Sequence, residues 1–275
     1  MDLEIITIYC VCDDHLISIG HHDDPQSQMS TSEIMTTALV ASSFFSGSHE
    51  KSRQFLKEYG YIPQMLSKSQ FNRRLHQIPE SLWHSFMEMI AQIAHSNNPL
   101  RTYLVDSFPV SVCHNIRINR CHIYQEEDFR GYNASKKEYF YGLKIHLIVS
   151  ESGIPVEFFL SPGGYSDTSA LYDFAFLLPK GSCVHGDKAY NVYELEDELE
   201  KEKNIHLMPI RKKNSKRNYD SFISRGIKYI RKRIESIISV IEQWFPNHIH
   251  AVIHQGFELK VLLFTLAYGI KAAMM

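Results

Sequence analysis

The chain has 275 residues, which is enough for one large domain or two of modest size. An apolar fraction of 44% and a charged fraction of 22% are those of a soluble globular protein, and no run of apolar residues is long enough to cross a membrane. The net charge of −2 excludes a globally cationic protein, and an acidic start at Asp2 and Glu4 is unlike a signal peptide.

The cysteines favour a reduced, cytosolic protein. There are five, an odd number, and no two are spaced as a CxxC pair. The alternative is zinc binding by the cysteines at positions 10 and 12, or by the Cys-His pairs at 113–114 and 121–122. These spacings match no common zinc site.

The first ninety-six residues have the apolar periodicity of helices. Residues 20–25 form a polar linker, and Ser32 is expected to cap the helix that follows it. Helices are expected over residues 3–19, from Ser32 to about residue 41, over residues 49–59, around residues 67–78, and from Pro79 to about residue 95. This part of the chain is therefore predicted to be all-helical.

The third and fourth of these helices are compatible with a DNA-binding helix-turn-helix. Gly60 ends the first helix of the pair, and the second is basic. Its apolar residues Phe71, Leu75 and Ile78 are expected to face inward, while Lys68, Arg73 and Arg74 are free to face out. Two helices of an ordinary bundle have the same pattern, so both interpretations stay open.

Residues 97–99, Asn-Asn-Pro, are the best candidate for a domain boundary. They separate a helical, DNA-binding domain at 1–96 from a second domain at 97–275. In the second domain the pattern predicts strands at 102–112, 139–149, 154–160, 183–185 and 205–210, and helices at 168–178, 192–203, 230–244 and 257–273. This order predicts an α/β fold with a mixed sheet and helices packed on it.

A dense basic block lies between the last strand and the helix that follows. Residues 211–233 hold ten lysines and arginines, and Asp220 is the only acid among them. Such a block can bind phosphate even when the whole protein is near neutral. A solvated loop is the alternative, but the block leads directly into the helix that carries Glu235, which favours nucleic acid.

That helix has a buried stripe with an acid beside it. Its apolar residues recur at helical spacing, at Ile230, Ile234, Ile237, Ile241 and Trp244. Glu235 lies at the rim of the stripe, and Arg231 and Glu242 share its edge of the helix. A carboxylate in this position is held firmly and remains near water.

Two aspartates upstream complete a candidate metal site. Asp106 lies on the first predicted strand, and Asp187 follows the fourth, at the strand end where ligand sites of α/β sheets gather. Carboxylate oxygens from three elements suit magnesium, and two divalent ions suit phosphodiester chemistry. Each acid also has a purely structural interpretation: Asp106 as a turn cap near Pro109, Asp187 as a helix N-cap, and Glu235 as a partner of Arg231.

These segments carry a resemblance to bacterial insertion-sequence transposases of the DDE type. The first is residues 105–110 with Arg117 and Arg120, the second is Gly-Asp-Lys-Ala-Tyr at 186–190, and the third is residues 231–235, followed by 256–260 and 266–268. Residues 32–34 and 71–74 in the helical part are also similar. The resemblance therefore covers nearly the whole chain.

The resemblance implies an RNase H-like core in which Asp106, Asp187 and Glu235 hold two Mg²⁺ ions, with Mn²⁺ as a substitute. It implies double-stranded DNA as partner, both the terminal inverted repeats of the element and target DNA. It also implies a homodimer in the synaptic complex and a nucleoid-associated protein of the bacterial cytoplasm. A stand-alone nuclease with the same core and an inactive DNA-binding remnant are the rival interpretations.

The resemblance also suggests which cations contact DNA. Arg231 matches the arginine of the third motif. The fuller motif has a tyrosine and a lysine where this chain has Lys228 and Glu242, and Glu242 competes with Glu235 as the third acid. The expected DNA-contacting residues are Arg231, Lys228, Lys232, Arg211, Lys212, Lys213, Arg73, Arg74, Lys68, Lys144 and Lys188, of which Lys144 and Lys188 fit surface charge equally well.

Overall fold

The computed structural model describes residues 1–133 and 136–274, and these form two compact units. One unit comprises residues 1–90 and 259–275, and the other comprises residues 91–258. The C-terminal helix thus belongs largely with the N-terminal helices.

The first unit is helical. Its elements are α1 (Asp2–Ser18), α2 (Thr31–Phe44), α3 (His49–Glu58), α4 (Lys68–Gln77), most of α5 (Glu80–Ser96) and most of α9 (His254–Ala273). α2 is its centre, because α1, α3 and α4 all pack against it and its residues from Thr31 to Ser42 are largely buried. The prediction of an all-helical N-terminal region is confirmed.

Two of these helices begin with a capping box. The Ser30 side chain accepts a hydrogen bond from the N–H of Glu33, whose carboxylate accepts one from the N–H of Ser30. Ser67 and Gln70 do the same at the start of α4. The predicted N-cap at Ser32 is wrong by two residues, since Ser32 is buried in the first turn and its hydroxyl donates to Asp13 instead.

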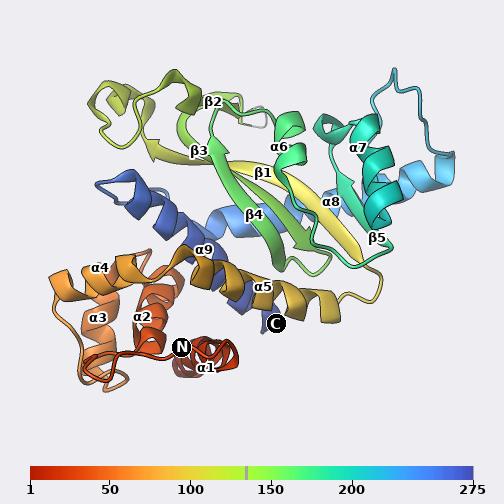
Figure 1. The fold of residues 1–275 in the computed structure, drawn as a ribbon. Helices are drawn as coiled ribbons and strands as arrows, with labels where there is room; N and C mark the ends of the chain where they lie inside the picture. Colours follow the sequence, from red (N-terminus) through yellow and green to blue (C-terminus); the bar gives the residue numbers. More distant parts are fainter. Residues whose placement is uncertain (134–135, 275) are drawn as a thin grey trace. The chain divides into compact units, whose positions relative to one another are not determined.

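The second unit is built on a six-stranded mixed sheet (Figure 1). Its strands are β1 (Thr102–Cys113), β2 (Arg130–Asn133), β3 (Glu138–Ser150), β4 (Pro155–Pro162), β5 (Ser182–Gly186) and β6 (Ile205–Pro209). β4, β3 and β1 pair antiparallel, and β5 and β6 continue parallel to β1. The resulting order β4-β3-β1-β5-β6, with helices on the sheet, is that of an RNase H-like fold.

β2 is the one strand that the periodicity does not predict. It has four residues, Arg-Gly-Tyr-Asn, and only Gly131 is buried, so no alternating apolar pattern exists to reveal it. Pro109, by contrast, does not end β1. Proline is tolerated there because β5 pairs only with residues 102–104 of β1, which leaves that edge unpaired at Pro109.

α6 (Asp167–Asp173), α7 (Tyr193–Glu198) and α8 (Ser221–Trp244) complete this unit. α6 is shorter than the predicted helix at 168–178 and continues as extended chain from Phe174. α8 crosses one face of the sheet against β1 and β5 (Figure 1). Among the residues described in the two units, no helix has both the length and the apolar character needed to cross a membrane.

Candidate active site at the β1 and β5 strand ends

The structure brings Asp106 and Asp187 together on neighbouring strands. The parallel pairing of β1 and β5 ends with Leu104 opposite His185, and each aspartate lies two residues further along the chain: Asp106 within β1, and Asp187 just after the end of β5. Residues advance equally along two parallel strands, so the two aspartates lie at the same level of the sheet. This juxtaposition follows directly from the register.

Asp106 points to the face of the sheet that α8 covers. Phe108, two residues on and therefore on the same face, makes an edge-to-face contact with Phe245 immediately after α8, with ring centroids 5.5 Å apart. Ser107 points to the opposite face, where its hydroxyl donates a hydrogen bond of 2.7 Å to Asp167 of α6. Asp106 thus lies between the sheet and α8.

The electrostatics of Asp106 are those of a crowded carboxylate. Burial raises its pKa to about 7, helped by the nearby carboxylates of Asp187 and Asp167 and opposed by the N–H of Ser107 and by Arg231. Asp106 Oδ1 accepts a 2.8 Å hydrogen bond from the N–H of the adjacent Ser107. A cation bound beside Asp106 would offset the repulsion between its carboxylate and those of Asp187 and Asp167.

Tyr190 lies against the same cluster of carboxylates. Its side chain is buried, and burial raises the pKa of its hydroxyl well above the usual range, with Asp106, Asp167 and Asp187 adding to the effect. One hydroxyl therefore senses all three carboxylates. Its ring packs against Gly186, where a Cβ atom would lie 2.8 Å from Tyr190 Cδ2.

Asp187 also caps the short 3-10 turn Lys188–Tyr190. Its Oδ1 accepts a 2.6 Å hydrogen bond from the N–H of Ala189. The structural interpretation of Asp187 is therefore correct as far as one oxygen is concerned. The cap orients the carboxylate, and it is compatible with a ligand role for the second oxygen.

Glu235 reaches this site through Arg231. Arg231 lies near enough to Asp106 to lower its pKa, and its Nη2 lies 3.1 Å from Glu235 Oε1 one turn along α8. The Glu235 side chain is 61% exposed, so it stands at the rim as expected. Exposed pairs of this spacing contribute only about 0.3–0.5 kcal/mol, so the Glu235 carboxylate is readily released.

The buried stripe of α8 is slightly rotated from the prediction. Ile234 and Ile241 are buried as expected, but the others are Ile227 and Ile238, while Ile230, Ile237 and Trp244 are half-buried at the edge. The helix begins at Ser221, more than two turns before the predicted start, and its buried stripe therefore extends back to Ile227.

Glu242 has a different environment. Its Oε1 lies 2.5 Å from Nζ of Lys136, in the segment between β2 and β3. It lies two turns beyond Glu235 along α8, and no link through Arg231 ties it to Asp106. The geometry therefore favours Glu235 as the third acid.

Asp167 is a site residue that the sequence alone did not single out. It accepts hydrogen bonds from Ser107 and from Nζ of Lys144, 3.3 Å away, and it raises the pKa of Asp106. In the sequence it looks like an ordinary acid at a helix start, preceded by the cap Ser166. Only the packing of α6 onto β1 and β3 reveals its place.

The donor set fits a hard divalent cation. Asp106, Asp187 and Glu235 offer only carboxylate oxygens, and Asp106 lies where a cation would offset the repulsion of its neighbours. In the described part of the chain, no three His, Cys, Asp or Glu side chains are already gathered to hold a metal ion. Of the three, Glu235 is the exposed member, so it would have to turn towards the aspartates to share a metal ion with them.

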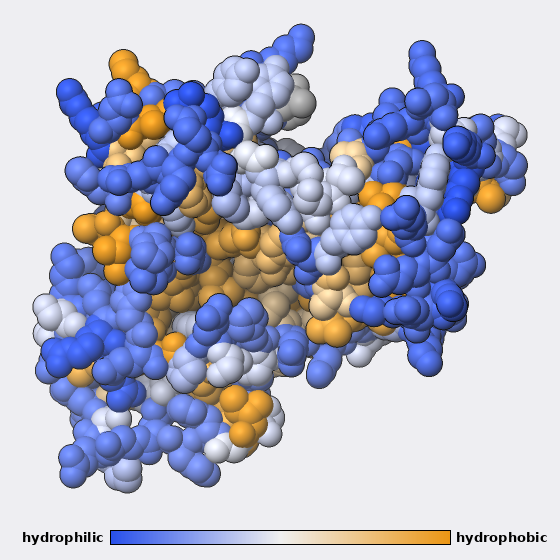
Figure 2. Space-filling view, turned by 45° about the horizontal axis from the view of Figure 1, so that its top comes forward, coloured by the Kyte–Doolittle hydropathy of each residue, from blue (hydrophilic) through white to orange (hydrophobic). Residues whose placement is uncertain are grey.

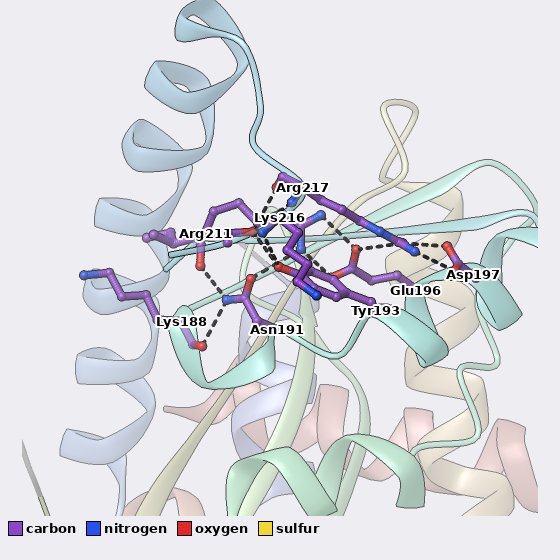
Figure 3. Close-up of polar contacts among 10 residues, drawn as sticks. Lys188, Asn191, Tyr193, Glu196, Asp197, Arg211, Lys216 and Arg217 are labelled. Atoms are coloured by element: carbon purple, nitrogen blue, oxygen red, sulfur yellow. Dashed lines mark hydrogen bonds and ion pairs between the residues drawn. The ribbon is translucent and has the colours of Figure 1, made fainter. Parts of the chain in front are cut away.

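Three of the cations expected to contact DNA are held by other protein groups. Lys144 is 14% exposed and donates to Asp167 and to the carbonyl of Tyr165. Arg74 contacts Asp23, the Ser27 hydroxyl and the carbonyl of Met29, so it is not free as expected. Arg211 forms a nearly buried pair with Glu196 (Figure 3).

The remaining expected cations are accessible. These side chains are exposed, except that of Arg231, which is partly buried: Lys68, Arg73, Lys188, Lys212, Lys213, Lys228, Arg231 and Lys232. Lys228, Arg231, Lys232 and Glu235 recur at spacings of three and four residues, so they share one side of α8. Three cations thus lie on the same side of α8 as Glu235.

Comparison with known proteins decides the family. A family model described as a transposase DDE domain matches residues 97–254, more than half of the chain, and that range includes Asp106, Asp187 and Glu235. The chain belongs to the DDE transposase family. No significant match was found among curated proteins, and none among solved structures. DDE transposases act on DNA and generally use divalent metal ions, which agrees with an all-carboxylate site beside exposed cations.

Proposed function

We propose that this DDE transposase cleaves DNA at the ends of its own insertion sequence and transfers the strands to target DNA. The observation that supports this best is the register that sets Asp106 and Asp187 side by side, with Arg231 of α8 near Asp106 and paired with Glu235. In this proposal Asp106, Asp187 and Glu235 are the catalytic residues and the ligands of two Mg²⁺ ions, which Mn²⁺ can replace.

Each protein group has a defined task. When bound, the two ions neutralise charge on the attacking and leaving oxygens of the phosphodiester. Asp106 contributes a carboxylate fixed by its strand, and Asp187 contributes one oriented by the hydrogen bond from Ala189. With a cation bound, Glu235 would leave its contact with Arg231 to serve as a ligand, and Arg231 would be available for a DNA phosphate.

DNA would be held by the exposed cations around these acids. Lys228 and Lys232 flank Arg231 on α8, and Lys188 directly follows Asp187. Lys68 and Arg73 of α4 would bind DNA through the helical region, proposed as the end-recognition domain at residues 1–96. Cleavage at two paired ends further implies a homodimer in the synaptic complex, acting at the bacterial nucleoid.

The test uses purified protein with Mg²⁺ or Mn²⁺, a labelled duplex carrying the terminal repeat of the element, and a supercoiled plasmid as target. Cutting at the repeat boundary, followed by joining of the label to the plasmid, is the expected result. Cutting scattered along any duplex, without joining, would identify a stand-alone nuclease. Tight binding without cutting in either metal would identify an inactive DNA-binding remnant.

A further inference from the structure

The segment between β6 and α8 carries accessible lysines. Residues 212–216, named here the lysine loop, include Lys212, Lys213 and Lys216, all exposed. Within residues 1–133 and 136–274 these three side chains have no carboxylate partner. The right-hand part of Figure 2, where Figure 1 places α7 and this segment, is mostly hydrophilic. A flexible loop of this kind would ordinarily have no defined position.

Here the start of the loop is anchored by a nearly buried ion pair. Arg211 makes two hydrogen bonds to Glu196 of α7, of 2.5 and 2.8 Å, and the two side chains are only 10% and 8% exposed. The guanidinium also stacks 4.5 Å above the ring of Tyr219. A bidentate pair removed from water in this way is rigid.

The end of the loop is anchored by the same helix. Arg217 makes two hydrogen bonds to Asp197, of 2.6 and 2.7 Å, and lies over the ring of Tyr193. The Tyr193 hydroxyl lies 2.6 Å from the Ser215 hydroxyl and accepts a hydrogen bond from the N–H of Lys216. Figure 3 shows Arg211 and Arg217 converging on the adjacent acids of α7.

The base of the loop is also tied to the turn that follows Asp187. Asn191 donates hydrogen bonds to the carbonyls of Ile210 and Lys188, and its Oδ1 accepts one from Arg211. Ile210 in turn donates to the carbonyl of Gly186. The chain on both sides of Asp187 is therefore hydrogen-bonded to Ile210 and Arg211, the two residues that precede the lysine loop.

We propose that Tyr193, Glu196, Asp197, Arg211 and Arg217, named here the clasp, hold the lysine loop so that its three lysines bind DNA phosphates beside Asp187. This inference rests on the proposed function, because it assumes DNA as partner. The two arginines are positioning residues, because each is paired with a carboxylate of α7. The three lysines are the residues that contact DNA phosphates. The clasp thus divides the basic block into a structural part and a binding part.

For the DNA affinity of one variant, the clasp predicts the opposite of what the net charge alone predicts. Glu196→Gln removes a negative charge close to the loop, so general electrostatics predicts equal or tighter DNA binding. The clasp predicts weaker binding, because a loosened loop no longer presents its lysines together. Glu198→Gln removes the same charge from an exposed position on α7 and serves as the matched control.

The experiment measures the affinity of the full chain for a labelled duplex by fluorescence anisotropy, in EDTA so that no cutting occurs, between about 50 and 200 mM salt. Replacing the three lysines with alanine should lower the slope of log K against log salt by about 2 to 3. Glu196→Gln should weaken binding several-fold and lower the slope by about one or more, whereas Glu198→Gln should not. Thermal melting confirms that each variant is folded.

Tyr193→Phe keeps the proposal testable if Glu196→Gln does not fold. This variant lacks one hydroxyl and keeps the net charge. It should also lower the slope of log K against log salt, and it should make trypsin cleave faster at the lysine loop, because the hydroxyl contacts Ser215 and Lys216. A folded Tyr193→Phe or Glu196→Gln variant that binds with the slope of the wild type overturns the clasp and leaves the proposed function intact. Absence of DNA binding by the wild type at any salt would overturn both.

Discussion

Asp106 is subject to the strongest electrostatic conflict in the candidate site. Burial and the carboxylates of Asp187 and Asp167 raise its pKa to about 7, while the N–H of Ser107 and the guanidinium of Arg231 act in the other direction. Such a carboxylate adds little to the stability of the fold without a cation. Its arrangement is explained by binding a ligand better than by packing.

Asp106→Asn separates these roles. Without metal, the melting temperature should stay unchanged or rise, because the amide removes a charge that its neighbours repel. Adding Mn²⁺ should raise the melting temperature of the wild type by a few degrees through binding to the folded state, and that rise should be lost in the variant. An equal metal-induced rise in the variant would show that Asp106 is not a ligand.

Asp167→Asn should behave differently, although it also removes an acid from the cluster. Asp167 accepts hydrogen bonds from Ser107 and from the mostly buried amino group of Lys144. Weakening these contacts should lower the free energy of unfolding by about 1–3 kcal/mol in urea denaturation. A variant as stable as the wild type would show that these contacts are not structural.

At the scale of the elements, the turn after β5 depends on a glycine that has little free space around it. At Gly186 a Cβ atom would lie 2.8 Å from both Tyr190 Cδ2 and Val105 Cγ1, within a closely packed core. Gly186→Ala should therefore cost about 1–3 kcal/mol and displace Asp187, which denaturant unfolding and loss of cleavage would both report.

Gly226 provides the matched control. It lies inside α8, and a Cβ atom there meets nothing within 4 Å. Gly226→Ala should stabilise α8 by about 0.5–1 kcal/mol, since alanine restricts the unfolded chain and favours helix. Equal destabilisation by both substitutions would argue against the close packing described for Gly186.

Most of the elements are predictable because their apolar residues alternate or recur at helical spacing, as in β3 and α5. The exceptions have physical causes. β2 is too short and polar to show a period, and α6 stops at Asp173 because the chain leaves the helix at Phe174, and Phe174 and Phe176 are both buried in the core. The periodicity of a short sequence segment does not show where tertiary packing ends a helix or adds a short strand.

At the scale of the whole molecule, long-range pairing decides which charges are available. Arg211 and Glu196 are fifteen residues apart, and Lys144 and Asp167 lie on different elements, so sequence alone classed both cations with the DNA-binding residues. The alignment of Asp106 with Asp187 could be anticipated, because Asp106 lies on one predicted strand of the sheet and Asp187 directly follows another. The fourth carboxylate, Asp167, could not.

The helical unit should be sensitive to mild acid. Burial lowers the pKa of His49 to about 4, with Lys260 and His76 acting in the same direction. Between pH 6.5 and that value the unfolded chain binds the proton and the folded chain does not, so the histidine costs stability as the pH falls, by at most about 1.4 kcal/mol per pH unit.

His49→Gln should therefore flatten the dependence of unfolding free energy on pH between about 6.5 and 4. The same substitution at the exposed His84 is the matched comparison. The measurement is urea unfolding at a series of pH values, compared as slopes and not as absolute stabilities. A His49→Gln slope equal to that of the wild type would show that His49 titrates normally in the fold.

The measurement that tests the central claim most directly is metal-dependent nicking at the boundary of the terminal repeat. Wild type would be compared with Asp106→Asn, Asp187→Asn and Glu235→Gln, and with Glu242→Gln as the matched change on α8. We expect nicking to fall by at least about a thousand-fold in the first three variants, as when transition-state charge stabilisation is removed, and to persist in the last. Nicking that survives Glu235→Gln and disappears in Glu242→Gln would contradict the assignment of the third acid, and nicking that survives Asp187→Asn would contradict the site itself.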